Sequence, residues 1–184
     1  MTVIPLMVEQ TNIAGLLSIT MKQVTDERGT VREFYRQSSW REAGLPDLGP
    51  WQQVNLTETR PGGLRGLHGE AMHKLVAIAS GLAFGAYVDA RADSPTYGAV
   101  ATLLLQPGQQ VLVPQGVCNG FQSIGSTPTQ YLYCFDAEWM PGMAGVATNP
   151  LDPGLGIAWP LPVDVHDPSQ ISAKDAAAPP LAGT

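Results

Sequence analysis

The amino-acid sequence predicts an all-β protein with a few short helices. Of its 184 residues, 20 are glycine and 16 are proline, and only 14% are charged. Short apolar runs alternate with glycine- and proline-containing turns, a pattern typical of sandwiches and barrels. The length suits one domain with a good core, and no linker or internal repeat divides the chain. We expect a single domain over 1–184, with a core of about 15–162 and a tail at 163–184.

The first expected element is a hairpin. Apolar residues alternate over 17–21, a DERG turn follows at 26–29, and 31–35 form the returning strand. Arg28 and Glu33 lie on this hairpin. Periodicity alone favours an exposed pair on an edge strand, where such charges add little stability.

A short helix and a strand with one polar face follow. Residues 38–43 fit the helix, with Ser39 as a candidate cap and Trp40 as an apolar anchor. Along 51–59 amide and hydroxyl side chains then take every second position: Gln53, Asn55 and Thr57. This face fits the inside of a barrel, where a bound polar ligand would satisfy it, and it fits a solvated outer face equally well.

The second half of the chain continues as strands until it reaches the tail. Strands are expected at 82–91, on both sides of a Pro-Gly turn at 107–108, and as one long strand over 129–139. From Leu161 the periodicity disappears and the residues become small, polar and proline-rich. This composition predicts a surface segment without a chemical role.

Charge and cysteine usage exclude several classes of function. The net charge of -6 and the scattered basic residues argue against a nucleic-acid partner, although a few converging arginines would suit a small anion. Cys118 and Cys134 lie in apolar strand-like segments and are expected as reduced, buried thiols. No stretch approaches eighteen apolar residues, so we expect a soluble, cytoplasmic protein.

Two stretches, 62–81 and 107–121, are similar in layout to the paired motifs of cupins. Metal cupins place His, His and Glu in the first motif and a further His in the second, a ligand set that suits a first-row metal. Here only His68 remains. The other three ligand positions hold Glu70, Lys74 and Asn119. An ammonium at a ligand position argues against a metal and leaves the histidine free for acid and base chemistry.

The residues around His68 suit proton abstraction next to a ketone. On a regular strand, Glu70 and Lys74 point to the same side as His68, while His73 points away. An imidazole can take a proton near neutral pH, and an ammonium can stabilise an oxyanion as it develops. Asp152, in a proline-flanked turn, is a candidate carboxylate, although turn formation alone explains an aspartate there.

A series of motifs spread over Thr25–Pro160 carries a more specific resemblance. In chain order they read DERGTVREF, QVN, LRGLHGE, KLV, SPTYG, VPQGVCNGF, YLYCFDAEWMPG and LDPGLGIAWP. Together they resemble the dTDP-4-dehydrorhamnose 3,5-epimerase family of cupins. This resemblance implies a jelly-roll homodimer that acts on a dTDP-linked 4-keto-6-deoxyhexose without a metal or an organic cofactor.

The resemblance also implies roles for individual residues. His68 would be the catalytic base, Asp152 its carboxylate partner, and Lys74 the group near the keto oxygen. The residues implied for the diphosphate, the sugar and the nucleotide are Arg65, Gln53, Asn55, Arg28 and Glu33, the last two partly across the dimer. For Arg28 and Glu33 this implication replaces the exposed pair that periodicity favours.

The chain also departs from the family pattern at several positions. Trp139 aligns where the family has a tyrosine acid, and an indole N–H does not give up a proton near neutral pH. Asn119 replaces a histidine, and Gly69 with Glu70 replaces a Tyr-Gln pair. We expect Glu70, Asn119 and Trp139 to contact the substrate.

Three outcomes remain open from the sequence. The protein epimerises C3, C5 or both, with water, Tyr131, Tyr133 or Glu70 as the acid. It carries out a related carbanion reaction on a nucleotide-linked ketosugar, or it is a non-catalytic protein that binds nucleotide sugars. The joint presence of His68, Lys74 and Asp152 favours catalysis.

Overall fold

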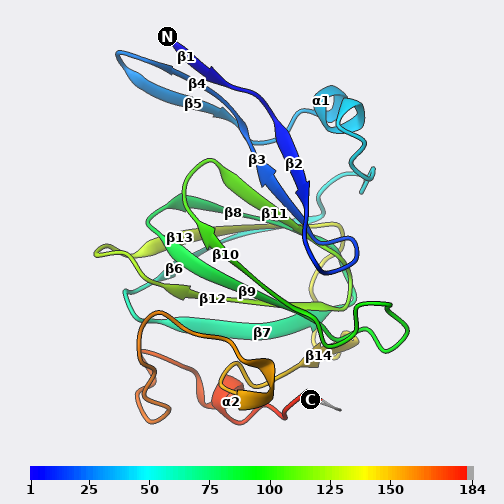
Figure 1. The fold of residues 1–184 in the computed structure, drawn as a ribbon, viewed down its shortest axis with the longest axis vertical. Helices are drawn as coiled ribbons and strands as arrows, with labels where there is room; N and C mark the ends of the chain where they lie inside the picture. Colours follow the sequence, from blue (N-terminus) through cyan, green and yellow to red (C-terminus); the bar gives the residue numbers. More distant parts are fainter. Residues whose placement is uncertain (182–184) are drawn as a thin grey trace.

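A computed structural model describes residues 1–181 and confirms the all-β class (Figure 1). The largest antiparallel sheet contains, in spatial order, β2 (Met7–Gln10), β3 (Leu17–Thr20), β11 (Gln109–Val113), β8 (Lys74–Ser80), β13 (Thr129–Phe135) and β6 (Gln53–Thr59). A second sheet contains β10 (Val100–Leu105), β9 (Ala83–Asp89), β12 (Val117–Ser123), β7 (Leu64–Glu70) and β14 (Gly145–Ala147). These two sheets form the jelly-roll barrel. Among residues 1–181, no helix has the length and apolar character needed to cross a membrane.

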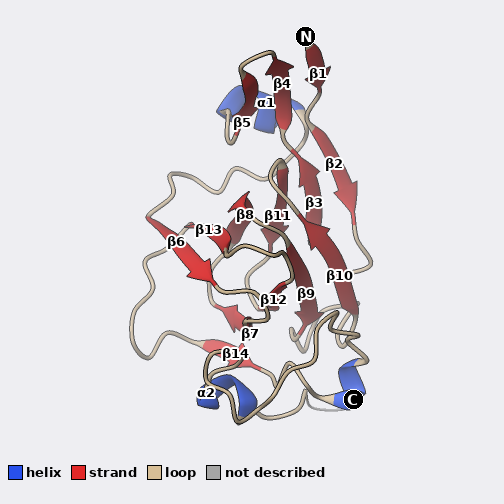
Figure 2. Ribbon diagram, turned by 90° about the vertical axis from the view of Figure 1, so that its left-hand side faces the viewer, coloured by secondary structure: helices blue, strands red, loops and turns tan. Residues whose placement is uncertain are grey.

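A small third sheet extends from one end of the barrel. It contains β1 (Thr2–Ile4), β4 (Lys22–Asp26) and β5 (Gly29–Glu33), and the last two form a hairpin about the expected DERG turn. The first strand expected for this hairpin, 17–21, is instead β3 of the large sheet, where it pairs with β2 and β11. Figures 1 and 2 show this sheet at the opposite end of the molecule from β7. The hairpin therefore stands away from the cupin motif of its own chain.

The expected helix, α1 (Gln37–Glu42), is present but has a different N-terminus. Its N-cap is Arg36, which makes no side-chain capping bond, so Ser39 is not the cap. Trp40 is the anchor that the sequence predicted, because it is 4% exposed and its Nε1 donates to the Pro46 carbonyl at 2.9 Å.

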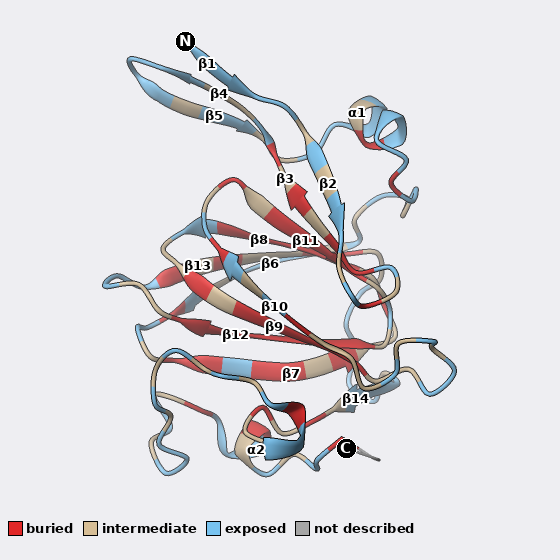
Figure 3. Ribbon diagram, in the orientation of Figure 1, coloured by how far each residue is buried: buried red, intermediate tan, exposed pale blue. Residues whose placement is uncertain are grey.

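The main core lies between the two large sheets (Figure 3). Inward side chains from both sheets meet there, and Phe121 stacks on Tyr131 with 4.0 Å between ring centroids. Alternation explains the arrangement, since every second residue of a strand faces the same side. Cys118 and Cys134 are free and buried, as predicted, and burial raises the pKa of Cys118 to about 12.

The strand expected over 129–139 ends earlier, at Phe135. The next residue, Asp136, turns toward the β7–β8 connection. Its carboxylate accepts hydrogen bonds from the backbone N–H of His73 and from His73 Nδ1, each at 2.8 Å. This two-point contact fixes the chain direction and leaves 137–144 as a loop beside the barrel.

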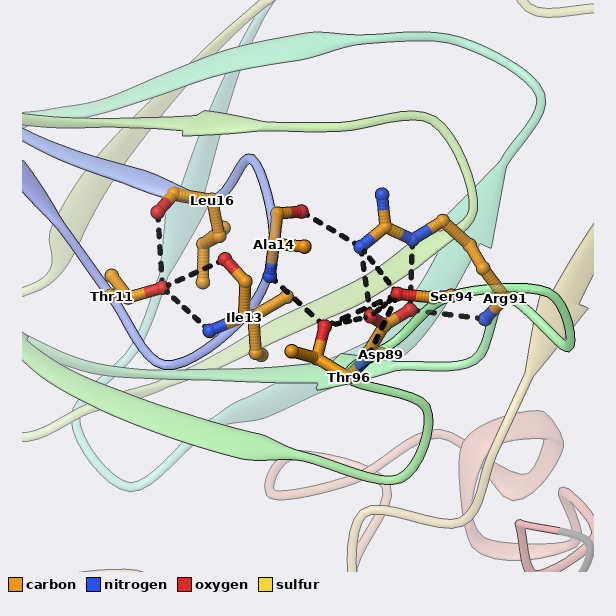
Figure 4. A network of polar contacts seen from close by, with 8 residues as sticks. All are labelled: Thr11, Ile13, Ala14, Leu16, Asp89, Arg91, Ser94 and Thr96. Carbon is orange, nitrogen blue, oxygen red and sulfur yellow. Dashed lines mark hydrogen bonds and ion pairs between the residues drawn. The ribbon is translucent and has the colours of Figure 1, made fainter.

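A buried polar cluster joins the β9 end of the barrel to the N-terminal turn (Figure 4). Asp89 is fully buried and accepts hydrogen bonds from Arg91, Ser94 and Thr96. Arg91 also donates to the Ala14 carbonyl at 2.8 Å. Burial would raise the pKa of Asp89, but these donors outweigh it and hold the pKa well below its usual range.

The C-terminal segment differs from the prediction of a surface tail. It carries α2 (Ala173–Ala176), which is capped by Ser172 and contacts β7. The Gln170 carbonyl accepts a bond from Leu64 N–H at 2.6 Å, and the Pro179 carbonyl accepts one from Asn149 N–H at 2.8 Å. The segment is therefore docked on the lower sheet of Figure 1.

Candidate active site

A cavity of about 420 Å³ opens between the two large sheets. Strands β6, β8 and β13 line it from one sheet, and β7 and β12 line it from the other. Side chains of the docked C-terminal segment complete one wall. The two cupin-like stretches thus lie around a single cavity.

A close approach of two glycines shapes the β7 wall. Gly66 has a φ of 111°, in the region that favours glycine, and a Cβ there would lie 2.6 Å from the Gly120 Cα. The pairing of β12 with β7 shifts register at this point, and His68 then pairs with Asn119. The glycines in LRGLH and CNGF thereby bring the two strands together beside the histidine.

His68 pairs with a carboxylate that the sequence analysis did not select. Its Nε2 lies 2.7 Å from Asp175 Oδ1, and the Asp175 side chain is 8% exposed. Burial would raise the pKa of Asp175, but the bonds from His68, Ser172 and Gly66 outweigh it and lower the pKa. Asp175 is then a carboxylate near neutral pH, so Nε2 carries the proton and Nδ1 has the free lone pair.

The expected pairing of His68 with Asp152 is therefore wrong. Asp152 caps a 3-10 helix, where one oxygen accepts from Gly154 N–H at 2.9 Å and the other from Leu181 N–H at 3.2 Å. The expectation of a surface tail is also wrong, because this segment carries α2 and brings Asp175 against His68. The spacing of Ser172 and Asp175 is a helix-cap signal that could have revealed α2, but it could not reveal its partner.

Lys74 lies deep in the cavity, close to His68. It begins β8, because 71–73 form a turn after β7, so the single regular strand assumed earlier is two strands. Its side chain is 3% exposed, and Nζ donates to Asn119 Oδ1 at 2.6 Å and to the His68 carbonyl at 3.0 Å. Nζ also forms an ion pair with Glu70. The convergence of these side chains agrees with the expectation.

Tyr133 and Trp139 differ in their relation to the cavity. Tyr133 belongs to β13, faces the cavity from the sheet opposite His68, and stacks on Phe135 with 5.7 Å between centroids. Trp139 also lines the cavity but lies in the loop and is 53% exposed. Tyr131 is fully buried in the core and is not among the cavity residues.

The polar face of β6 proves to be the inner one. Asn55 and Thr57 line the cavity, while Val54 and Leu56 are exposed on the outer side. Gln53 lies just outside the lining, where its Nε2 donates to Asn55 and its Oε1 accepts from Trp139 N–H at 2.7 Å. We infer that Gln53 supports the cavity wall.

Besides Lys74, two further basic side chains line the cavity. Arg65 is exposed, and its Nε donates to Thr59 Oγ1 at 2.8 Å. Lys174, which the sequence analysis did not select, comes from α2. An anionic group of a ligand could lie between these two cations.

Arg28 and Glu33 are not among the residues that line this cavity. Arg28 pairs with Asp26 at 2.6 Å, and Glu33 pairs with Arg36 at 2.5 Å, all on or next to the distant hairpin. Arg28 and Glu33 thus do not pair with each other, as periodicity favoured, but each pairs with a neighbour in the sequence. A role in ligand binding would require a second copy of the chain.

Among residues 1–181, no three or more His, Cys, Asp or Glu side chains form a group that could hold a metal ion. His68 instead uses Nε2 for Asp175, and Lys74 fills the space beside Glu70. These contacts suit proton transfer and oxyanion stabilisation.

Comparison with known proteins identifies the relatives of this arrangement. The profile of the family described as dTDP-4-dehydrorhamnose 3,5-epimerase matches residues 10–183. The chain belongs to this family. A curated relative, the dTDP-4-dehydrorhamnose 3,5-epimerase of Salmonella typhimurium, is 34% identical over 181 residues, which cover 95% of this chain and 94% of the relative.

Further relatives of the dTDP-4-dehydrorhamnose 3,5-epimerase family extend the comparison. The dTDP-4-dehydro-6-deoxyglucose 3-epimerase of Streptomyces bikiniensis is 32% identical, with 86% of this chain and 80% of the relative covered. The crystal structure of the 3,5-epimerase RmlC from Legionella pneumophila in complex with dTDP-4-keto-L-rhamnose is 31% identical, with a TM-score of 0.84. The aligned region covers 96% of this chain and 93% of the Legionella chain. The cupin fold implied by the sequence is thus confirmed.

Proposed function

We propose that this protein epimerises a dTDP-linked 4-keto-6-deoxyhexose at C3, C5 or both by removing the proton next to the C4 ketone. The observation that carries the proposal is the His68–Asp175 pair facing Tyr133 across one cavity, with Lys74 between the sheets. Relatives named as 3,5-epimerases and as a 3-epimerase support the reaction class and leave the choice of carbon open.

His68 is the proposed base. Asp175 accepts the Nε2 proton, so it fixes the tautomer with a basic Nδ1 and stabilises the imidazolium that forms when a proton is taken. Asp175 can perform this role because it stays ionised near neutral pH, as its lowered pKa indicates. Asp152, which the sequence had suggested for this role, acts instead as an anchor of the C-terminal segment.

Lys74 is the proposed electrostatic partner of the enolate. Removing the proton next to the ketone places negative charge on the keto oxygen. A buried ammonium acts strongly on such a charge because little water screens it. Lys74 is 3% exposed and lines the same cavity as His68, which supports this role.

Tyr133 is the proposed donor that returns the proton. Inversion requires a donor on the face of the sugar opposite the base, and β13 belongs to the sheet opposite β7. Burial, together with Tyr131, raises the pKa of Tyr133 well above its usual range, so the phenol keeps its proton until the carbanion is present. Glu70 shares β7 with His68, and Tyr131 lies in the core, so both are weaker candidates.

The binding roles follow from the cavity walls. We assign the diphosphate to Arg65 and Lys174, because these cations face the cavity. Asn55 and Asn119 offer amide groups to the sugar, and exposed Trp139 offers an apolar face to either the sugar or the base. A tryptophan at position 139 is then compatible with catalysis, because Tyr133 supplies the acid.

Proton NMR of dTDP-4-keto-6-deoxyglucose with the protein in deuterated buffer tests the reaction. Loss of the H3 and H5 signals is expected for a 3,5-epimerase, and loss of H3 alone for a 3-epimerase. If neither proton exchanges while saturation transfer shows bound nucleotide, the protein is a binding protein or acts on another ketosugar, and the proposal fails.

Matched variants test the division of roles. His68→Ala should abolish deuterium incorporation with nucleotide binding nearly intact, while Arg65→Ala should weaken binding first. Tyr133→Phe should slow inversion by about 10²–10⁴-fold, the range for a positioned acid, while His68 continues to exchange a proton on its own face. Equal losses of exchange and binding in the His68 and Arg65 variants would contradict these assignments.

We further propose a homodimer, in which the hairpin bearing Arg28 and Glu33 reaches the cavity of the second copy. Exposed apolar side chains on β1, on the hairpin and on the outer face of β6 support an interface: Val3, Val31, Val54 and Leu56. Light scattering after gel filtration should give twice the chain mass. A fully active monomer would refute the proposed homodimer. The cytoplasmic location expected from the sequence likewise stays a prediction.

A further inference from the structure

Lys74 is an unusual group to find so deep in a protein interior. Its side chain is 3% exposed, and burial lowers its pKa. The ammonium has three N–H donors, and its three contacts are Asn119 Oδ1, the His68 carbonyl and the Glu70 carboxylate. Two of these acceptors are neutral. Only a charged partner offsets most of the cost of burying the cation.

Glu70 is that partner among the residues that the structure describes, since it makes the one carboxylate ion pair of Lys74 between positions 1 and 181. Burial would raise the pKa of Glu70, but Lys74 outweighs it and the pKa is lowered. In the reverse direction Glu70 raises the pKa of Lys74 against the effect of burial. Each group therefore keeps the other charged.

Glu70 is poorly placed for proton transfer across the sugar. It lies two residues after His68 on the same strand, so it approaches a bound sugar from the side of the base. Its carboxylate is already engaged with Lys74.

We infer that Glu70 is a positioning residue that keeps Lys74 protonated and aimed at the developing enolate oxygen. No bond to the substrate is needed for this role. The kinetic part of the inference rests on the proposed function, but the ionisation of Lys74 is a property of the protein without ligand. The two can therefore fail separately.

The primary test is an NMR titration of Lys74 in protein labelled with ¹³C-lysine. Lys22 and Lys174 are the other lysines of the chain, so Lys22→Arg and Lys174→Arg assign the signals. Glu70→Gln should lower the proton affinity of Lys74 by about tenfold or more, because a neighbouring carboxylate contributes at least this much. Asp47→Asn, which removes the exposed partner of Arg41, is the matched control and should change nothing.

A second variant moves the carboxylate to another contact of the same ammonium. Asn119→Asp places it at the atom 2.6 Å from Nζ. Combined with Glu70→Gln, Asn119→Asp should restore the proton affinity of Lys74. As a single substitution, Asn119→Asp should raise that affinity, so the test remains available even if Glu70→Gln alone does not fold. An unchanged Lys74 titration in these variants overturns the inference.

The kinetic readout is the pH profile of solvent exchange. The enolate needs Lys74 as a cation, so a lower proton affinity moves the alkaline loss of activity in Glu70→Gln to lower pH, with nucleotide affinity little changed. Loss of activity at every pH with an unmoved Lys74 titration would show that Glu70 transfers a proton itself. If the unaltered protein exchanges no proton, the proposed function fails while the titration still decides the role of Glu70.

Discussion

Two histidines that lie five positions apart in the sequence, His68 and His73, each pair with an aspartate, yet the two pairs differ in their surroundings. The nitrogen–oxygen distance is 2.7 Å in His68–Asp175 and 2.8 Å in His73–Asp136. The histidine side chains are 36% and 37% exposed. Contact distance and exposure alone therefore cannot separate a catalytic pair from a structural one.

The two pairs differ in the groups that surround them. Asp136 accepts from both the backbone and the ring of His73, a closed contact that joins two loops. His68 instead lines a cavity with a buried cation and a tyrosine on the facing sheet. A catalytic assignment should therefore rest on the groups around a pair more than on the pair itself.

The largest difference in activity is expected when each of the two aspartates is replaced by asparagine. Asp175→Asn removes the charge that fixes the His68 tautomer, so solvent exchange into the ketosugar should fall by about 10²–10⁴-fold. Asp136→Asn keeps an acceptor for the His73 backbone, and exchange should stay within a few-fold of the unaltered rate. NMR initial rates check both, and similar losses in the two variants would remove the distinction.

Asp89 extends the comparison to a buried carboxylate that does not bond to a histidine and does not line the cavity. Asp89→Asn should lower the free energy of unfolding by about 3 kcal/mol, since Arg91 and two hydroxyls lose a charged acceptor. The pKa of Asp89 is depressed in the folded state, so its contribution is present above the unfolded value of 3.8 and is lost as the pH falls through the folded value. Urea midpoints should decline in acid less steeply for the variant.

The smallest effect is expected at Asp152, which holds the segment that carries Asp175. Asp152→Asn retains one acceptor and weakens the bonds to Gly154 and Leu181. If the substitution weakens the docking of the C-terminal segment by about 1 kcal/mol, solvent exchange should be roughly fivefold slower, with the substrate affinity unchanged. Single-turnover rates at saturating substrate measure it. A loss as large as that of Asp175→Asn would return Asp152 to the role suggested by the sequence.

The sequence predicts well those features that depend on local pattern. Period-two alternation located the barrel strands, and the polar side chains of LRGLHGE and KLV converge at one cavity as expected. Both cysteines are buried because their segments are apolar. These outcomes follow from side-chain alternation and burial, which each segment encodes by itself.

The partner of His68 depends on a contact that no local pattern encodes. Asp175 lies 107 positions further along the chain, in a segment whose composition suggested a solvated tail. Asp152 was the more visible candidate because it sits in a recognisable motif. The early end of β13 had a similar cause, since Asp136 bonds to His73 in the β7–β8 connection.

The docked C-terminal segment has a consequence for the order in which the protein is assembled. Every strand of the barrel precedes Asp175 in the sequence, so a nascent chain can close both sheets before the partner of its base has been synthesised. Bringing two residues together across so long a separation carries a loop-closure entropy that the bonds of Gln170 and Pro179 help to offset. Competence for chemistry would thus be acquired after the barrel itself, as a late event in folding.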